Sequence, residues 1–126
     1  MRDPAKYAVL VVEDDPAIRR LVSMVLGREG YRIETATDGV EAVLKLGVNE
    51  YDAIVLDLML PKLDGFAVIE TLAEHYPNRL RRIIVTSAAA PATILERMQG
   101  IRFNLLPKPF DIGELSSRVR SCIGQA

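Results

Sequence analysis

The sequence lacks three features that would place it in a specialised class: paired cysteines, a strong net charge and long apolar runs. Cys122 is the only cysteine, which excludes an internal disulfide and is typical of a reducing cytoplasm. The formal net charge of -1 gives no broad field to attract nucleic acid or an anionic membrane. No apolar run approaches the length of a membrane span, and the apolar stretch after residues 1–4 is too short for a signal peptide. We therefore expect a cytoplasmic protein with no membrane segment and no direct contact with nucleic acid.

Repeats, linkers and low-complexity segments are also absent, which predicts a single domain over residues 1–126. With 126 residues, of which 49% are hydrophobic, the chain is long enough to bury a core. The one basic cluster, Arg79, Arg81 and Arg82, comes directly before a predicted strand. We interpret this cluster as a solvated approach to the strand rather than as a nucleic-acid patch.

Five short segments are predicted to be strands, and most of them are apolar without alternation, as in strands buried on both faces of a parallel sheet. They are residues 7–12, 32–36, 53–56, 83–85 and 103–106. Five segments with helical periodicity follow them in alternation. This order predicts an α/β protein, in which a doubly wound, five-stranded parallel sheet is covered on both faces by helices in right-handed crossovers.

The predicted helices have recognisable start signals. Asp15 is suited to cap the first helix, with Pro16 at the first helical position, and apolar residues then recur at helical spacing until Gly30. Asp38 and Asp111 cap two further helices, each with a glutamate three residues later. A third helix ends before residue 77, and a fourth, residues 93–99, has only a weak apolar stripe. The apolar stripes of the four stronger helices are Ile18, Leu21, Val22, Val25 and Leu26; Val40, Val43 and Leu44; Phe66, Ile69, Leu72 and Ala73; and Leu115, Val119, Cys122 and Ile123.

Four of the strands end at residues that can do chemistry: Glu13 and Asp14 after the first, then Asp57, Thr86 and Lys108. The carboxyl ends of parallel strands share one edge of a sheet, where open α/β sheets bind ligands. Two carboxylates about 4 Å apart repel each other by roughly 4 kcal/mol at an effective dielectric constant near 20, so this group requires a cation. Lys108 supplies one positive charge, and the remainder suits Mg²⁺, since Ca²⁺ needs more oxygen ligands and Zn²⁺ needs histidine or cysteine.

A carboxylate, a divalent metal, a lysine and a hydroxyl around one point predict a site for phosphoryl transfer. Asp57 would attack phosphorus in line and form an aspartyl phosphate, while Mg²⁺ and Lys108 neutralise charge on the phosphoryl oxygens. Thr86 would donate a hydrogen bond to one of these oxygens. Such a bond is worth roughly 1.5–3 kcal/mol, which shifts a two-state equilibrium about ten- to a hundredfold and is enough to switch a loop.

Four motifs carry a resemblance to a known family: VVEDDP after the first strand, LDLMLPKLDG around Asp57, VTS after the fourth strand and PKPF after the last. In this order and at this spacing, they make the chain resemble the receiver domains of bacterial two-component response regulators over essentially its whole length. The resemblance implies a flavodoxin-like sheet with strand order 2-1-3-4-5. It also implies a phosphoprotein of a phosphorelay, which is not an enzyme but catalyses its own phosphorylation and dephosphorylation.

The resemblance assigns the metal ligands by position. Glu13 and Asp14 are the acidic pair, with Asp14 the more direct ligand of Mg²⁺. Asp57 is the phosphoacceptor and a further ligand, and the backbone carbonyl of Met59 is the third protein ligand. These assignments agree with the independent argument that the acidic edge needs a divalent cation.

The resemblance also assigns the remaining site residues and the partners. Thr86 is the switch hydroxyl, Lys108 pairs with the phosphoryl group, and the Lys108–Pro109 peptide bond is expected to be cis. A sensor histidine kinase or phosphotransfer protein is the expected donor. The face formed by the fourth helix, the fifth strand and the fifth helix is expected to contact a downstream protein or effector domain. Formation of a homodimer through the same face is left open.

Two positions depart from the family pattern. The family usually has an aromatic residue three positions before the lysine, whereas this chain has Leu105, and Phe103, which stands at a different position, is a poor substitute. The second departure concerns Met59 and Ala88, which lie two residues after the acceptor and two after the hydroxyl and cannot orient an attacking water. We expect the phosphate on Asp57 to persist as a result.

Simpler interpretations stand beside these. Asp15 is expected to be a helix cap only, and His75 an exposed helix end rather than a phosphorelay histidine. For Thr86, the alternative that its hydroxyl only bonds to the backbone stays open. For Lys108, the alternative of an ordinary surface lysine stays open.

Three other functions share parts of the pattern. A Mg²⁺-dependent phosphohydrolase with an aspartate nucleophile needs a second acid two residues after Asp57, where Met59 stands. An FMN-binding flavodoxin needs a phosphate-binding loop after the first strand, which is acidic here. A receiver that acts as a constitutive, unphosphorylated interaction module stays open, and neither the kinase, the target nor an effector domain can be identified from the sequence.

Overall fold

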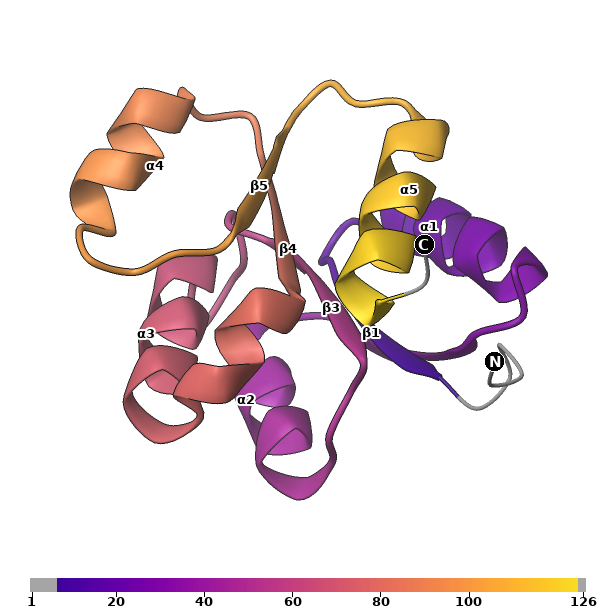
Figure 1. Cartoon of the computed structure of the whole chain (residues 1–126), viewed down its shortest axis with the longest axis horizontal. Helices are drawn as coiled ribbons and strands as arrows, with labels where there is room; N and C mark the ends of the chain where they lie inside the picture. The colour runs from indigo at the N-terminus through magenta and orange to yellow at the C-terminus, as the bar shows by residue number, and fades with distance from the viewer. Residues whose placement is uncertain (1–6, 125–126) are drawn as a thin grey trace.

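The computed structural model describes residues 7–124 and contains a central five-stranded sheet with helices on both faces (Figure 1). In chain order its elements are β1 (Ala8–Val12), α1 (Pro16–Arg28), β2 (Arg32–Ala36), α2 (Gly39–Val48), β3 (Ala53–Asp57), α3 (Gly65–His75), the 3₁₀ helix η2 (Pro77–Arg82), β4 (Ile83–Ser87), α4 (Pro91–Arg97), β5 (Asn104–Pro107) and α5 (Ile112–Ile123). The expectations about residues 1–4 and about residues 125 and 126 lie outside the described part of the chain.

The strand order is β2-β1-β3-β4-β5, and every neighbouring pair is parallel. The predicted doubly wound α/β fold and its strand order are therefore confirmed. Parallel pairing sends every strand in the same direction, so the carboxyl ends of β1, β3, β4 and β5 lie at one edge. The register places Asp57 directly opposite Thr86 at that edge.

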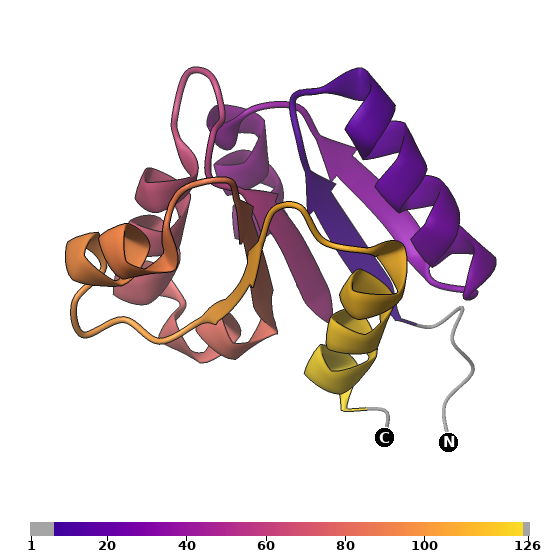
Figure 2. The ribbon, with the colours of Figure 1, turned by 90° about the horizontal axis from the view of Figure 1, so that it is seen from above.

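The two faces of the sheet are covered by different helices (Figure 2). Alternate strand residues point to opposite faces, so β1 sends Leu10 into one core and Val9 and Val11 into the other. The first core is closed by α2, α3 and α4, and the second by α1 and α5. Both layers are apolar and buried, which makes the sheet a rigid support for the residues at its edge.

The predicted caps are present. The Asp15 carboxylate accepts hydrogen bonds from the amides of Ala17 and Ile18, so α1 begins at Pro16 as expected. Asp111 likewise accepts from the Glu114 amide at 2.7 Å and starts α5. His75 ends α3 and is exposed, in agreement with its interpretation as a helix end.

The predicted inward face of α2 is wrong for Val40 and Leu44, whereas Val43 is partly buried and packs against the core as predicted. Val40 and Leu44 are 44% and 66% exposed, whereas Gly39, Ala42 and Leu46 are buried. The segment carries two apolar stripes, and the one that contains Ala42 and Leu46 packs into the core. A related exception is Leu21 of α1, which is 45% exposed.

The region before β4 differs most from the expectation. Residues 77–82 form a 3₁₀ helix, and two arginines of the basic cluster are partly buried rather than solvated. Arg79 donates to the Leu46 carbonyl at 2.7 Å, and Arg82 donates to the Tyr51 carbonyl at 3.2 Å. Both side chains thus satisfy backbone carbonyls of neighbouring segments. Only Arg81 of the three is classed as exposed.

Several boundaries also move: β1 begins one residue later than predicted, and β3 and β4 end one and two residues later. The fourth helix spans Pro91–Arg97 instead of residues 93–99, because Pro91 occupies the first helical position, which suits a residue without an amide proton. The last strand is Asn104–Pro107, one residue later than predicted. Ile94 and Met98 are the buried residues of the α4 region, in keeping with its weak apolar stripe.

Candidate functional site

Three acidic side chains converge at the carboxyl edge of the sheet. Glu13 and Asp14 follow β1, and Asp57 is the last residue of β3. One carboxylate oxygen from each lies within 4.8 Å of the others. Glu13 and Asp57 are 5% and 4% exposed, whereas Asp14 is exposed. The structure thus brings together the acidic residues that the sequence predicted, with Asp14 on the solvent side.

Lys108 points its ammonium group at the two buried acids. Its Nζ lies 3.3 Å from Asp57 Oδ2 and 3.7 Å from Glu13 Oε1. The Lys108 amide donates to the Ser87 carbonyl at 2.8 Å, which ties the lysine loop to the end of β4. The Lys108–Pro109 peptide bond is cis, as the resemblance implied.

Thr86 and the loop residues that follow β3 are also close to Asp57. Thr86 is 3% exposed and pairs in register with Asp57, and its carbonyl accepts from the Leu58 amide at 3.2 Å. The Met59 amide donates to Asp57 Oδ1 at 3.1 Å, while the Met59 side chain is 70% exposed. Asp57 is therefore held from two sides, by the Met59 amide on one oxygen and by Lys108 on the other.

The electrostatics of the cluster are unbalanced. Burial raises the pKa of the Glu13 carboxyl from 4.5 to about 7; the negative charge of Asp57 adds to the rise, and the Asp15 amide and Lys108 oppose it. The cluster has three carboxylates and one lysine, so the charged form of Glu13 is disfavoured unless a cation binds beside it. Clustered carboxylate oxygens, without histidine or cysteine, suit a hard divalent cation such as Mg²⁺. The donor set therefore fits the predicted metal.

Arg19 is a contributor that the sequence did not reveal. Its Nη1 donates to the carbonyls of Glu13 and Asp14 at 3.1 Å and 3.3 Å. These bonds brace the backbone of the acidic loop from the first turn of α1. Arg19 reads in the sequence as one of several charges on the solvent face of a helix, so its spacing alone gave no signal.

Two hollows flank the acidic edge. One, of about 460 Å³, is lined by Asp14, Met59, Phe66 and Arg97 among others, and it opens beside the acidic cluster. The second, also about 460 Å³, borders Lys108 and is mainly apolar; it is lined by Ile18, Leu21, Val22, Ala88, Lys108, Pro109, Phe110 and Ile112. The edge is thus accessible from both sides.

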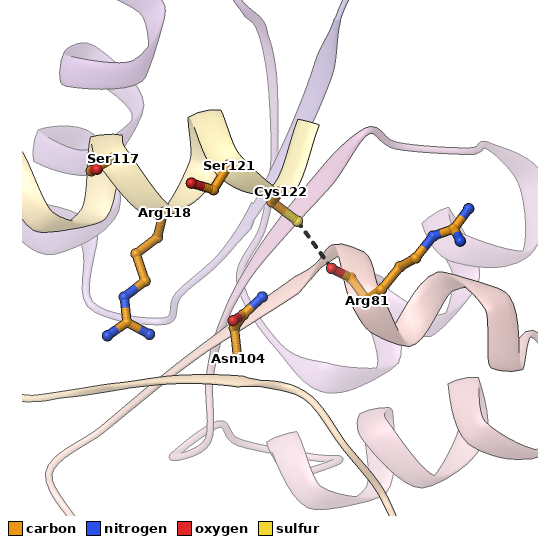
Figure 3. Close-up of a pocket in the computed structure, with 6 residues that line it drawn as sticks. All are labelled: Arg81, Asn104, Ser117, Arg118, Ser121 and Cys122. Carbon is orange, nitrogen blue, oxygen red and sulfur yellow. Dashed lines mark hydrogen bonds between the residues drawn. The ribbon is translucent and has the colours of Figure 1, made fainter. Parts of the chain in front are cut away.

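A larger hollow of about 510 Å³ lies elsewhere, at the amino ends of β4 and β5 (Figure 3). In this view the Arg81 side chain extends away from Asn104 and Cys122, while the Cys122 thiol donates to the Arg81 carbonyl at 3.2 Å. Arg118, which also lines the hollow, donates to the Leu105 carbonyl at 2.9 Å. The Arg118 side chain here serves a backbone contact, and the hollow is at the opposite end of the strands from Asp57.

The family model described as the response regulator receiver domain matches residues 9–120. This chain belongs to that family. The receiver assignment agrees with the geometry, since the matched segment contains all of the acidic cluster and Lys108. No helix in residues 7–124 has the length and apolar character needed to cross a membrane.

Curated relatives of this receiver domain are longer proteins, and two of them are named as transcriptional regulators. The chain is 38% identical over 118 residues to the DNA-binding dual master transcriptional regulator RpaA of Synechocystis, a match that covers 91% of this chain and 48% of the relative. It is 36% identical over 120 residues to the transcriptional regulatory protein TcrA of Mycobacterium tuberculosis, covering 90% and 44%. The chain therefore spans about half the length of the curated relatives it matches.

Solved structures with the same fold cover nearly the whole chain. The receiver domain of the Francisella response regulator 1452 has a TM-score of 0.84 and 31% identity, covering 95% of this chain and 98% of that one. The receiver domain of the sensor histidine kinase PA1611 from Pseudomonas aeruginosa has a TM-score of 0.82 and 31% identity, covering 94% and 98%. That structure has a magnesium ion coordinated in its active site cleft.

Proposed function

We propose that this receiver domain is a phosphorylation-controlled switch whose acceptor is Asp57. The observation that carries the proposal is the contact of Lys108 Nζ with Asp57 Oδ2 at 3.3 Å beside the clustered oxygens of Glu13 and Asp14. A solitary buried carboxylate would pair with the lysine alone. Here two further carboxylates lie beside the pair, and their uncompensated negative charge suits a divalent cation. A lysine and a divalent cation beside a carboxylate are the groups that phosphoryl transfer requires.

The step that we propose is an in-line displacement at phosphorus. An oxygen of the Asp57 carboxylate forms a bond to phosphorus as the bond from phosphorus to a donor nitrogen or oxygen breaks, and the leaving group keeps the electron pair and takes up a proton. The donor is a histidine kinase or a phosphotransfer protein, by analogy with the family. Lys108 stabilises the negative charge on the phosphoryl oxygens, and the Met59 amide keeps the Asp57 carboxylate oriented.

The metal proposal names the residues that would hold the ion. The Asp14 and Asp57 carboxylates and the Met59 carbonyl are its proposed ligands, and Glu13 completes the acidic site. Mg²⁺ bound there supplies positive charge that stabilises the phosphoryl oxygens in the transition state. The protein residues provide the rest, because the rigid ends of β1 and β3 hold the ligands in place before the donor arrives.

The proposed output begins at Thr86. A phosphoryl group on Asp57 would attract the Thr86 hydroxyl, since the two residues are opposite each other in register. The loop from Ala88 to Ala90 and the short helix α4 follow directly, and their residues are mostly exposed. The face of α4, β5 and α5 is the proposed contact surface for a downstream protein, an effector domain or a second copy. Leu105 replaces the usual aromatic residue on this face.

The wider context is also proposed. Since the relatives are about twice as long and include DNA-binding regulators, an effector domain is the proposed target of the switch, and this receiver itself makes no direct contact with nucleic acid. We assign residues 1–126 to a single domain and place the protein in the cytoplasm, where its phosphodonors act. It is proposed to catalyse only its own phosphorylation and dephosphorylation.

Intact-mass measurement tests the proposal. The protein and an Asp57→Asn variant are incubated with acetyl phosphate and Mg²⁺, and with acetyl phosphate and a chelator. We expect one added phosphoryl group only for the wild type with Mg²⁺. Equal labelling of Asp57→Asn would contradict the assignment of the acceptor, and an unlabelled wild type would favour a constitutive interaction module.

The same samples address two further points. Continued release of phosphate from an added phosphoester, without a stable adduct, would indicate a phosphohydrolase instead. After removal of the phosphodonor, the adduct is expected to persist for a long time at neutral pH, because Met59 and Ala88 offer no group to orient an attacking water. Rapid loss of the added mass would contradict that expectation.

A further inference from the structure

Gly39, the first residue of α2, lies against the loop that follows the proposed phosphoacceptor. A Cβ atom placed on Gly39 would be 1.6 Å from the carbonyl oxygen of Leu63 and 2.8 Å from its Cβ. Carbon atoms that are not bonded pack at about 3.5–4.0 Å, so no side chain fits at this position. The backbone of the loop therefore rests directly on the first turn of α2.

Further contacts hold the loop against α2. The Gly39 amide donates to the Pro61 carbonyl at 3.5 Å, and Lys62 Nζ lies 3.4 Å from Asp38 Oδ2. The other oxygen of Asp38 accepts from the Glu41 amide at 2.8 Å, so one carboxylate both caps the helix and pairs with the loop. Lys62 has a φ of 67°, a left-handed conformation that a residue with a Cβ keeps only when its surroundings hold it.

The other end of the same loop contacts the acceptor itself. The Met59 amide donates to Asp57 Oδ1 at 3.1 Å. Between Met59 and Leu63 the chain is tightly folded, with the Leu63 amide donating to the Pro61 carbonyl at 2.8 Å. A short, tightly turned segment transmits a displacement at one end to the other. The contact of Leu63 with the first turn of α2 thus helps to fix where the Met59 amide lies relative to Asp57.

We propose that Gly39 is a positioning residue for the phosphoacceptor. Its missing side chain lets residues 58–64 lie close enough to α2 for the Met59 amide to hold Asp57 toward Lys108. The inference deepens the proposed function and rests on it, because it assumes that Asp57 and the Met59 carbonyl serve phosphoryl transfer with a divalent cation. A methyl group at Gly39 must push the loop outward and weaken that arrangement.

The same helix provides a matched control. A Cβ on Gly47 would meet nothing closer than the Tyr76 hydroxyl at 4.0 Å, which is an ordinary contact. Alanine is favoured over glycine inside a helix, so Gly47→Ala keeps or improves the stability of α2 without touching the loop. A difference between Gly39→Ala and Gly47→Ala therefore reports the loop contact.

The first experiment is a Mg²⁺ titration of phosphorylation by acetyl phosphate. Loss of a group that orients metal ligands typically costs ten- to a hundredfold in metal affinity, so we expect Gly39→Ala to raise the Mg²⁺ concentration for half-maximal rate by about tenfold. Gly47→Ala should match the wild type. A folded Gly39→Ala with an unchanged Mg²⁺ requirement would overturn the inference, whereas an unlabelled wild type would overturn the proposed function.

The second experiment needs no phosphorylation. Hydrogen exchange of the Met59 amide, measured by NMR without Mg²⁺, should be severalfold faster in Gly39→Ala and unchanged in Gly47→Ala. Equal exchange in the two variants would contradict the inference even if the wild type proved not to be phosphorylated. Should Gly39→Ala not fold, Lys62→Met decides, since the Lys62 side chain is 69% exposed: faster Met59 exchange supports the inference, and unchanged exchange overturns it.

Discussion

Single residues at the carboxyl edge combine burial with charge, and Glu13 shows what this does to proton binding. Its carboxyl is 5% exposed and lies near both Asp57 and Lys108. Burial raises the pKa of Glu13 to about 7 in the folded protein, against 4.5 for an ordinary glutamate. Without a divalent cation, and at a pH between 4.5 and about 7, the folded state therefore keeps a proton that the unfolded chain has already released.

We predict a pH dependence of stability from this difference. A raised pKa in the folded state adds stability below the ordinary value, and the contribution is lost as pH rises through about 7. Urea unfolding of the Mg²⁺-free protein should accordingly show a falling midpoint between about pH 5 and pH 8. Glu13→Gln should remove most of this slope. The same slope in Glu13→Gln would assign the effect to other groups.

At the scale of single residues, the sequence predicted the members of the site better than its supports. Asp14, Asp57 and Lys108 were recognised because each follows a strand whose end is recognisable along the chain. Arg19 was not, because in the sequence it is one of several charges on the solvent face of a helix, and only the structure shows its hydrogen bonds to the acidic loop.

Among the elements, α2 differs from its sequence pattern in the side that it buries. Its buried side is made of Gly39, Ala42 and Leu46, and its exposed side carries Val40 and Leu44. A helix with two apolar stripes has no preferred orientation in isolation. Packing in the tertiary structure selects the stripe with Ala42 and Leu46, which joins the core formed with β1, β3 and α3.

A pair of leucines tests this orientation. Leu46→Ala should lower the free energy of unfolding by about 2–5 kcal/mol, because it leaves a cavity in the core. Leu44→Ala should change it by no more than about 0.5 kcal/mol, because the side chain is already in solvent. Chemical denaturation of the two variants gives both values. A larger loss for Leu44→Ala would mean that α2 is rotated from the orientation described here.

Other elements followed their sequence signals closely. The caps of α1 and α5 form through neighbours two or three residues away, so local sequence was sufficient. The 3₁₀ helix η2 was missed, because Arg79 and Arg82 are held by carbonyls of Leu46 and Tyr51, more than thirty residues earlier in the chain. Local signals thus determine where helices begin, whereas distant partners determine what polar side chains do.

For the molecule as a whole, the site is where charged groups from the ends of separate strands contact one another. Lys108 reaches from the loop after β5 to acids at the ends of β1 and β3. Its ammonium is the positive group that contacts both buried carboxylates. Removal of this charge should therefore affect the stability of the entire sheet as well as phosphorylation.

Lys108→Met makes this testable. Loss of a hydrogen bond between charged groups leaves the acids uncompensated and should lower the free energy of unfolding by about 1–3 kcal/mol. Adding Mg²⁺ should recover part of the loss, because the cation binds the folded state. In Asp57→Asn, which removes one of the acids, Lys108→Met should cost less. Equal losses in both backgrounds, measured by urea unfolding, would show that the lysine and Asp57 are not coupled.

The sequence by itself determined the parallel α/β sheet, its strand order through family resemblance, and the identity of the acids, hydroxyl and lysine at one edge. These follow from buried strand segments, helix caps and motif spacing, which are all properties of the chain read in order. Tertiary structure alone decided which side of α2 is buried, how far the pKa of Glu13 rises, and that Gly39 meets Leu63. Each of these depends on how closely segments that are distant in the sequence approach one another. The sequence of a single segment does not determine that distance.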